Sequence, residues 1–301
     1  MIDQQTQSSM KVLEATGQYK VLARVPETLN SGKTATGKIF KAAVIDLETT
    51  GLDPKTEEII EIGLLIVSFT NEEGFIEVEF SDNQLQQPSR PITEEITNIT
   101  GITNEDVEGR AINWQQLEDE LTSVDLIICH NAYFDRNFME LQSPDHFSRL
   151  IKSKAFGCSS RGINWAALGF EGAKLEYLNL KMGFFYEGHR ALVDCWATLN
   201  LFIQKPVAFD ELKISVREKE AMICAVNAPF EKKDLLKQRG YRWSDGSGSL
   251  PKSWWVTVRE ELQQQELDYL KQDIYGGREV TLPSMIITAR KRYSYRAQEF
   301  E

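Results

Sequence analysis

Five side chains in four short segments of this 301-residue chain are of the types that one metal-dependent site needs. Asp46 and Glu48 end a short apolar run, and Asp135 closes a second segment after another apolar run. His189 and Asp194 supply the third and fourth pieces. In chain order the pattern reads D-x-E, then D, then H-x4-D. It combines four carboxylates with one imidazole.

Carboxylates are the ligands that hard divalent cations such as Mg²⁺ prefer. Two such ions about 3.5–4 Å apart can hold the attacking and the leaving oxygen of a phosphodiester displacement. Four carboxylates gathered without metal would repel one another, and bound ions would remove most of that repulsion. A histidine nearby could take a proton from the attacking water, because its pKa lies close to neutral pH. The set therefore favours two-metal phosphodiester hydrolysis.

A strand and a turn are expected to position the first two carboxylates. Alternate side chains on a strand point to the same face, so Asp46 and Glu48 share a face at the end of a buried strand over 44–47. The residues that follow, including Gly51 and Pro54, are typical of a turn. Gly51 would let the backbone approach a ligand closely.

Two helices are expected to carry the other groups. Asp135 follows a buried strand over 126–129 and opens a helix, and Asp194 lies in the first turns of a helix over 191–203. His189 precedes that helix in a loop. Its five-residue offset from Asp194 does not suit two zinc ligands on one helix face, which lie four residues apart. The buried stripe of the first helix is expected to comprise Phe134, Phe138 and Leu141.

Each piece also has an ordinary interpretation when it is taken alone. A D-x-E pair at a strand end is common, and Asp135 could be an acidic residue favoured by the helix dipole. His189 could be a loop histidine with an ordinary hydrogen bond. The chain has only three histidines, however, and His130 and His189 both fall inside the pattern. The ordered combination is what favours a shared site.

This order of motifs resembles the DEDDh 3'-5' exonucleases, and in particular bacterial epsilon-subunit-like exonucleases of DNA polymerase III. Residues 99–103, Ile-Thr-Gly-Ile-Thr, resemble the family's TGIT segment. Residues 189–198 resemble its HRALxDAxAT motif, with Cys195 where the family often has Ala. The likeness covers about residues 41–205. It implies a ribonuclease H-like α/β fold, with three antiparallel strands and then parallel strands in a mixed sheet flanked by helices.

The resemblance also implies a role for each motif residue. The metal-binding carboxylates would be Asp46, Glu48, Asp135 and Asp194, and the general base would be His189. The terminal 3' nucleotide would contact Thr49, with Leu52 as an apolar wedge under its base, although both could simply shape the turn. Asn131 and Phe134 complete the expected substrate contacts. The expected cofactors are two Mg²⁺ ions, which Mn²⁺ could replace.

The activity implied by the resemblance is release of nucleoside 5'-monophosphates from the 3' end of single-stranded or frayed nucleic acid, with DNA as the expected substrate. Two alternatives stay open. One is an RNA-directed exoribonuclease like RNase T or oligoribonuclease, because the motif chemistry does not sense the 2'-hydroxyl. The other is a non-catalytic nucleic-acid-binding adaptor. Proofreading within a polymerase complex is also left open by the sequence.

Composition and charge set limits on this interpretation. With 42% hydrophobic and 26% charged residues, the chain is expected to be globular, and it lacks a membrane-spanning run or a secretory signal. Four scattered cysteines indicate the cytoplasm. The net charge of −11 is unexpected for a nucleic-acid enzyme, because phosphate contacts usually come from Lys and Arg. However, residues 1–205 hold 18 Lys and Arg against 30 Asp and Glu, whereas residues 206–301 hold 16 against 15. We therefore expect end-binding at the metal site rather than extended duplex binding.

Three regions are expected along the chain. Residues 1–40 would be an extension with a short strand near 19–25 and a linker, and residues 41–205 the exonuclease domain. Residues 206–301 would begin with a linker and form a small α+β module, similar to one found in some epsilon-like exonucleases. The expected elements outside the motifs are strands over 59–69 and 74–80, helices near 114–121, 162–169 and 173–182, and, in the module, strands at 221–226, 241–243, 254–258 and 284–295 with helices at 231–239 and 259–274.

Two features of the last region could contact single-stranded nucleic acid. Aromatic faces can stack on unpaired bases, and one interpretation is that Trp243, Trp254 and Trp255 do so. The other is that they form the core of a small domain. Residues 290–296 interleave Arg and Lys with Tyr, which is typical of either a single-strand-binding patch or a charged edge strand. If either feature binds single-stranded nucleic acid, the module would guide a 3' end toward the acidic site.

Overall fold

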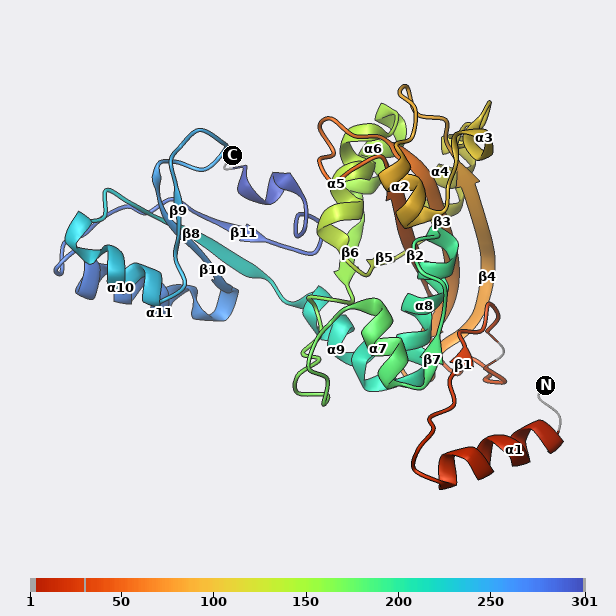
Figure 1. Ribbon diagram of the computed structural model, residues 1–301. Coiled ribbons are helices and arrows are strands. Elements are labelled where there is room, and N and C mark those ends of the chain that lie inside the picture. Colours follow the sequence, from red (N-terminus) through yellow and green to blue (C-terminus); the bar gives the residue numbers. More distant parts are fainter. Residues whose placement is uncertain (1–3, 30, 300–301) are drawn as a thin grey trace.

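The computed structural model describes residues 4–29 and 31–299, which form two parts joined side by side (Figure 1). Residues 1–3 and 30 of the expected N-terminal extension, and residues 300–301, lie outside the described residues. The larger part is a five-stranded sheet between helices, and the smaller part is a four-stranded sheet with helices on one side. No helix among the described residues is long and apolar enough to cross a bilayer.

The larger sheet has the strand order β4-β3-β2-β5-β6. Strands β2, β3 and β4 pair antiparallel, and β5 and β6 continue the sheet parallel to β2. This is the mixed sheet expected for a ribonuclease H-like fold, so the predicted fold class is confirmed. The strands are β2 (Phe40–Thr49), β3 (Ile59–Thr70), β4 (Gly74–Leu85), β5 (Leu126–Cys129) and β6 (Ala155–Cys158).

Helices cover both faces of this sheet, because strand β2 points apolar side chains alternately to one face and to the other. Val44 belongs to the core under α7, α8 and α9, and Ile45 to the core under α4, α5 and α6. Asp46 and Glu48 continue the Val44 series, toward α8. The helices are α2 (Glu94–Thr100), α3 (Asn104–Val107), α4 (Trp114–Thr122), α5 (Ala132–Gln142), α6 (Asp145–Ser153), α7 (Leu175–Lys181), α8 (Ala191–Gln204) and α9 (Pro206–Arg217).

Three expectations for this part are wrong. Residues 162–169 form turns instead of a helix, since the Asn164 side chain accepts from Ala167 N and closes a tight turn. The linker expected after Lys205 is helix α9, whose Phe209 belongs to the same core as α8. Leu141 is 48% exposed, because α5 buries polar residues on the side that meets the C-terminal tail.

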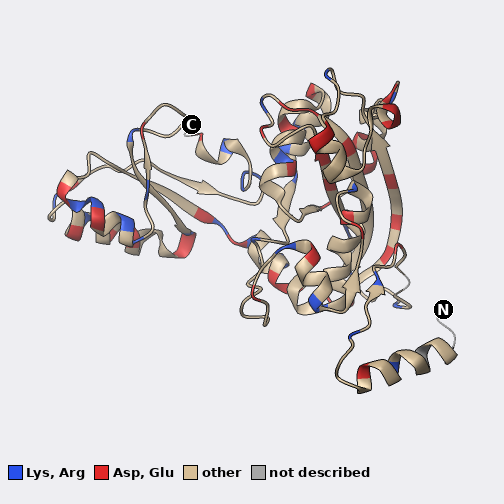
Figure 2. Ribbon diagram, in the orientation of Figure 1, with Lys and Arg blue, Asp and Glu red and all other residues tan. Residues whose placement is uncertain are grey.

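The N-terminal segment forms helix α1 (Gln4–Ala15), which stands away from the rest of the molecule (Figure 1). The expected strand near 19–25 is reduced to β1 (Ala23–Arg24), which pairs in parallel with β7 (Phe184–Phe185). Acidic residues recur along β4 and on α2, as the red segments in Figure 2 show. This agrees with the acidic balance of the N-terminal two thirds of the sequence.

The smaller part is a sheet in the order β11-β8-β10-β9, all antiparallel. Trp254 packs against the core beneath its helices, and Trp255 packs against a second core on the other face, whereas Trp243 is half-exposed. Two of the three tryptophans therefore help to form the core. The elements are β8 (Glu220–Val226), α10 (Lys233–Gln238), β9 (Arg242–Ser244), β10 (Ser253–Arg259), α11 (Gln263–Tyr269) and β11 (Ser284–Ile287), with 3-10 turns at Phe230–Lys232, Glu260–Leu262 and Tyr295–Gln298 and a π turn at Leu270–Ile274.

The tail after β11 leaves the small sheet and packs on the larger part. The strand expected over 284–295 ends at Ile287, and residues 288–298 form turns. Arg292 is buried, donating to the carbonyls of Ser215 and Glu218 and pairing with Glu220. The edge-strand interpretation of 290–296 is therefore wrong. The segment is not an open basic patch either, because Arg292 and Arg296 are held in ion pairs, although Arg292, Tyr293 and Ser294 line a hollow between the two parts.

Candidate metal-dependent active site

Strand β2 delivers the first two carboxylates at the edge of the sheet. Asp46 pairs in register with Gly63 of β3, and Glu48 pairs with Glu61 just before a bulge at Thr49. Since alternate residues share a face, both carboxylates point to the side of the sheet that α8 covers. The bulge ends the regular pairing, and the chain then turns away from the sheet.

Helix α8 brings Asp194 to the same place through a very close approach to β3. A β-carbon on Gly63 would lie 2.4 Å from the backbone of Ala191, so any side chain there would displace the start of the helix. Cys195, fully buried on α8, donates its thiol to the Gly63 carbonyl at 3.3 Å. As a result, one carboxylate oxygen from each of Asp46, Glu48 and Asp194 lies within 4.8 Å of the others.

Helix α5 supplies Asp135, which is only 2% exposed. Its carboxylate accepts from the backbone N–H of Leu47 on β2 and from the thiol of Cys129 on β5. It lines the same cavity as Asp46, Glu48 and Asp194. The four predicted carboxylates therefore meet at one end of the sheet, drawn from β2, α5 and α8.

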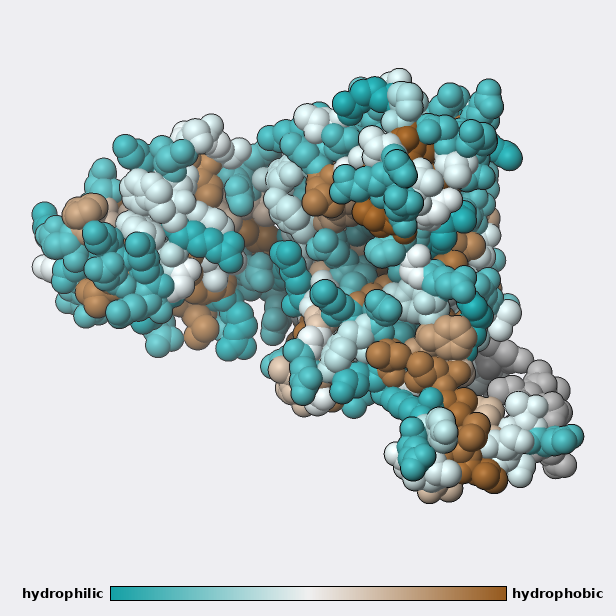
Figure 3. Space-filling view, viewed as in Figure 1, coloured by the Kyte–Doolittle hydropathy of each residue, from teal (hydrophilic) through white to brown (hydrophobic). Residues whose placement is uncertain are grey.

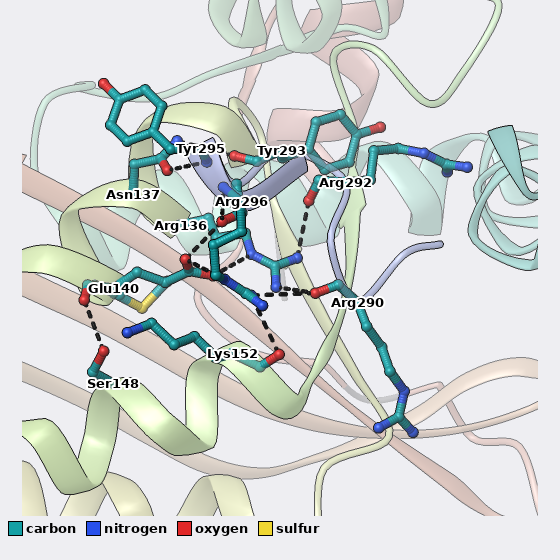
Figure 4. Close-up of polar contacts among 12 residues, drawn as sticks. Arg136, Asn137, Glu140, Ser148, Lys152, Arg290, Arg292, Tyr293, Tyr295 and Arg296 are labelled. Atoms are coloured by element: carbon teal, nitrogen blue, oxygen red, sulfur yellow. Dashed lines mark hydrogen bonds and ion pairs between the residues drawn. The ribbon is translucent and has the colours of Figure 1, made fainter. Parts of the chain in front are cut away.

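A buried ion network fixes α5 from its outer side (Figure 4). Arg136, next to Asp135, donates to Glu140 at 2.8 Å, and both side chains are buried. Glu140 also accepts from Arg296 at 2.8 Å and from Ser294 at 2.7 Å, both in the C-terminal tail. Three more guanidinium hydrogens of Arg136 are donated to tail carbonyls, those of Ala289, Arg290 and Arg292.

Burial and mutual repulsion shift the four carboxylates in one direction. Burial, then the nearby charges of Asp194 and Asp135, raises the pKa of Asp46 well above its ordinary value. Burial and Asp194 raise the pKa of Glu48 to about 8. Burial likewise raises the pKa of Asp135 to about 7 and that of Asp194 to about 6. A cluster that holds protons this tightly favours a divalent cation, which neutralises the same oxygens.

A cavity of about 840 Å³ opens over the cluster between α2 and the start of α5. Apolar side chains gather beside the hollow on the face shown in Figure 3. The other predicted site residues, Thr49, Leu52, Asn131, Phe134 and His189, also line this cavity. The structure thus brings all the predicted residues to one cavity.

The predicted substrate-contacting residues differ in their exposure and in the contacts that they already make. Leu52 is 84% exposed at the cavity, an unusual state for a leucine next to buried elements. The Phe134 ring packs against Phe138 at 4.8 Å and is partly buried. The Thr49 hydroxyl donates to the Gly51 carbonyl at 2.6 Å, so its hydrogen holds the turn. Asn131 makes no side-chain cap to α5, although it is the N-cap residue.

The two histidines near the cluster have different environments. His130 places Nδ1 2.8 Å from the Ser159 hydroxyl and Nε2 2.7 Å from the Ala173 carbonyl, and burial lowers its pKa to about 4. His189 is exposed at the cavity, with its backbone in the left-handed region at φ 65°. Its N–H donates to Asp194 at 2.8 Å. Of the two, only His189 presents a ring that is not already held on both sides.

Sequence reasoning missed two residues that shape the site, Glu61 and Tyr186. Glu61 is fully buried, pairs with Arg190 at 2.7 Å and accepts from Ala191 N at 2.8 Å, which anchors the loop holding His189. Tyr186 donates its hydroxyl to Asp194, and burial with that contact raises the tyrosine pKa. The signal for Glu61 was present, since an acid inside an apolar strand needs a partner. Nothing local distinguishes Tyr186.

The chain matches a known family of proteins over half its length. Residues 43–202 match the model of the exonuclease family named for RNase T, so the chain belongs to this exonuclease family. The family predicted from the motifs is thereby confirmed. The model ends before α9, so the family match does not extend to the C-terminal part.

Two relatives are a DNA polymerase III of the PolC type and a DNA polymerase III subunit. The chain is 32% identical to a PolC-type DNA polymerase III of Thermotoga petrophila over 169 residues, which is 54% of this chain and 11% of that protein. It is 29% identical to the DNA polymerase III subunit epsilon of Aquifex aeolicus over 164 residues, 54% of this chain and 78% of that protein. The chain therefore spans only about a tenth of the length of the PolC-type polymerase.

Two solved structures resemble the chain at low sequence identity. Exonuclease X in complex with 5' overhanging duplex DNA is 20% identical, with a TM-score of 0.42, and the match covers 58% of this chain and 99% of that one. Exonuclease I of E. coli in complex with a dT13 oligonucleotide is 15% identical, with a TM-score of 0.44, covering 73% and 63%.

Proposed function

We propose that this exonuclease removes nucleoside 5'-monophosphates from the 3' end of single-stranded or frayed nucleic acid. The main support is the convergence of Asp46, Glu48 and Asp194 within 4.8 Å, with Asp135 in the same cavity. A cavity of about 840 Å³ suits one or two terminal nucleotides, which favours an end over a long internal segment.

The donor set fits two divalent cations, Mg²⁺ or Mn²⁺. All four groups are carboxylates, which hard cations prefer. Burial, together with mutual repulsion, raises their pKa values, so the ionised cluster is unfavourable without cations. Asp46, Glu48 and Asp194 would hold one ion, and Asp135 with Asp46 would serve the second. When bound, such ions supply charge neutralisation at the phosphate and a more acidic attacking water.

The remaining residues would orient the substrate and move a proton. His189 would accept the proton of the attacking water through its exposed ring, while Asp194 holds the loop by its bonds to the backbone of His189 and Arg190. Leu52 would lie under the terminal base, which explains its exposure. Phe134, Asn131 and Thr49 would complete the contacts to the last nucleotides, Thr49 through its oxygen as an acceptor.

DNA is our proposed substrate because the relatives named above are DNA polymerase components. Association with a polymerase is a proposal on the same ground. RNA remains the alternative substrate, because the cavity residues do not by themselves select against a 2'-hydroxyl. We also propose a cytoplasmic location, since all four cysteines are buried and free, as in a reducing compartment.

The test is digestion of matched 5'-labelled DNA and RNA 15-mers with Mg²⁺, with Mn²⁺ and with EDTA. The expected result is a metal-dependent ladder shortened from the 3' end, faster on DNA, with 5'-monophosphates as products. The Asp46→Asn protein should be inactive, and His146→Ala, which changes a histidine outside the cavity, should be fully active. Internal cuts, or binding without any cleavage, would contradict the proposal and favour the adaptor alternative.

A further inference from the structure

A second hollow lies where the small C-terminal sheet meets the larger part, with a volume of about 400 Å³. We infer that this junction groove carries the unpaired strand that leads into the active site, a role that rests on the proposed function. The groove is lined by residues from both parts of the chain. On one side are Tyr133 and Arg161, and on the other Arg242, Trp255 and Thr257.

The groove and the active-site cavity share the first turn of α5. Asn131 and Phe134 line the cavity, and Tyr133, between them in sequence, lines the groove. The two hollows therefore lie beside each other at this turn, so a strand whose 3' end lies against Phe134 would leave the cavity next to Tyr133. This adjacency is what assigns the groove to the substrate rather than to a separate ligand.

Two arginines in the groove lie next to aromatic rings. The Arg161 guanidinium lies 6.0 Å from the Tyr133 ring centre, and the Arg242 guanidinium lies 5.4 Å from that of Trp255. On the other side of Tyr133 its ring meets Tyr295 edge-on at 5.6 Å. Grooves of this type bind single strands through phosphate contacts and base stacking, without needing a particular sequence.

The small sheet presents these groups because of its strand alternation. Arg242 of β9 and Trp255 of β10 are direct cross-strand partners, so they share one face. Trp254, one residue earlier, points to the other face and packs beneath the helices. The face with Trp255 turns toward the C-terminal tail, because Trp255 and Ala297 of the tail pack against the same buried cluster and line the same groove.

The charge of the groove is opposite to that of the active-site cavity. Its only acidic lining residue is Glu220, which is already paired with Arg292 at 3.1 Å. Within residues 4–29 and 31–299, neither Arg161 nor Arg242 is paired with a carboxylate, and both are exposed. In a chain with a net charge of −11, such a groove is a local place for phosphates.

The experiment compares the Arg161→Gln/Arg242→Gln protein with Arg149→Gln/Lys237→Gln, which changes two cations outside the groove. Fluorescence anisotropy with labelled dT15 and dT3 is measured across a salt series with Ca²⁺ in place of Mg²⁺, in samples whose oligonucleotides remain uncut, so that cations fill the carboxylate cluster without cleavage. The expected Kd for dT15 rises about tenfold in the groove variant, and its log–log salt slope falls by about 1.4, roughly 0.7 for each lost phosphate contact. The Kd for dT3, which ends within the active-site cavity, should change less than twofold.

Unchanged dT15 binding in the groove variant would overturn the inference, as would an equal loss in the control variant. An equal loss for a blunt 15-base-pair duplex would show that the groove is not selective for unpaired strands, and would also overturn it. Thermal unfolding confirms that both variants fold. Because binding is measured without cleavage, failure of the exonuclease proposal would appear separately, as absent digestion with the groove effect intact.

Discussion

Replacing Glu140 by Gln tests whether the C-terminal tail holds α5 in place. Gln keeps the size of the side chain but removes the charge that Arg136, fully buried, and Arg296 both contact. Removing one partner of a buried ion pair costs about 3–5 kcal/mol. The carbonyls of Ala289 and Arg292 still accept from Arg136, so we expect the lower end, about 3 kcal/mol.

The assay is thermal unfolding followed by calorimetry. For a chain of this size, each kcal/mol shifts Tm by roughly 2–4 °C, so Glu140→Gln should lower Tm by about 6–12 °C. Glu261→Gln is the matched control, because its pair with Arg259 is exposed on both sides and should matter little. A double variant with Arg296→Met should be less destabilised than the sum of the two single variants, since both changes break the same contact.

The pH dependence gives an independent check with a defined sign. Burial alone would raise the pKa of Glu140, but hydrogen bonds from Arg296, Arg136 and Ser294 hold it below its ordinary value. The carboxylate therefore contributes stability above the unfolded pKa of about 4.3, and this is lost as pH falls through the folded value. The Tm difference should be full at pH 7 and shrink toward pH 3. If the Glu140→Gln protein has the same Tm as the wild type at pH 7, the reasoning is refuted.

Three further predictions concern the site itself. Asp46→Asn should raise the Tm of the metal-free protein at pH 8, since carboxylates with raised pKa values cost stability as pH increases. The rise in Tm that Mn²⁺ causes should be smaller in this variant than in the wild type. A Tm in EDTA below that of the wild type would contradict the prediction. His189→Ala should reduce kcat by at least about 100-fold with little change in Tm, measured on a labelled oligonucleotide; near-normal turnover would show that another group is the base. Gly63→Ala should lower both Tm and activity, because its new methyl would lie 2.4 Å from the Ala191 backbone, and normal activity would show that α8 tolerates the shift.

Much of the site could be predicted because each motif residue sits at the end of an element that its own neighbours define. The apolar run before Asp46 predicts β2, and the run before His130 predicts β5, so the two strand ends meet once the strands pair. Helix α8 was expected over 191–203 and spans Ala191–Gln204. In these cases local periodicity and tertiary packing require the same structure.

The errors arise where a side chain's partner lies far away in the sequence. Residues 290–296 look like a nucleic-acid patch because Arg and Tyr alternate, yet Arg296 pairs with Glu140, 156 residues away. The same composition suits a buried ion network and an exposed binding surface, and only the partner distinguishes them. Pro206 likewise suggested a linker, although Pro is also favoured at the first turn of a helix, where α9 places it.

The opposite charges of the cavity and the groove bear on how an acidic enzyme can bind a polyanion. The cavity is lined by acids, among them Asp46 and Glu57, so without cations it repels phosphate. The surface along β4 is also acidic (Figure 2). A strand would then be attracted where Arg161 and Arg242 are exposed and where cations fill the carboxylate cluster. A duplex lying across the whole surface would meet mostly negative charge, whereas one unpaired strand could follow the groove to its 3' end. Preference for single-stranded ends would thus follow from where the charges lie, before any base is contacted.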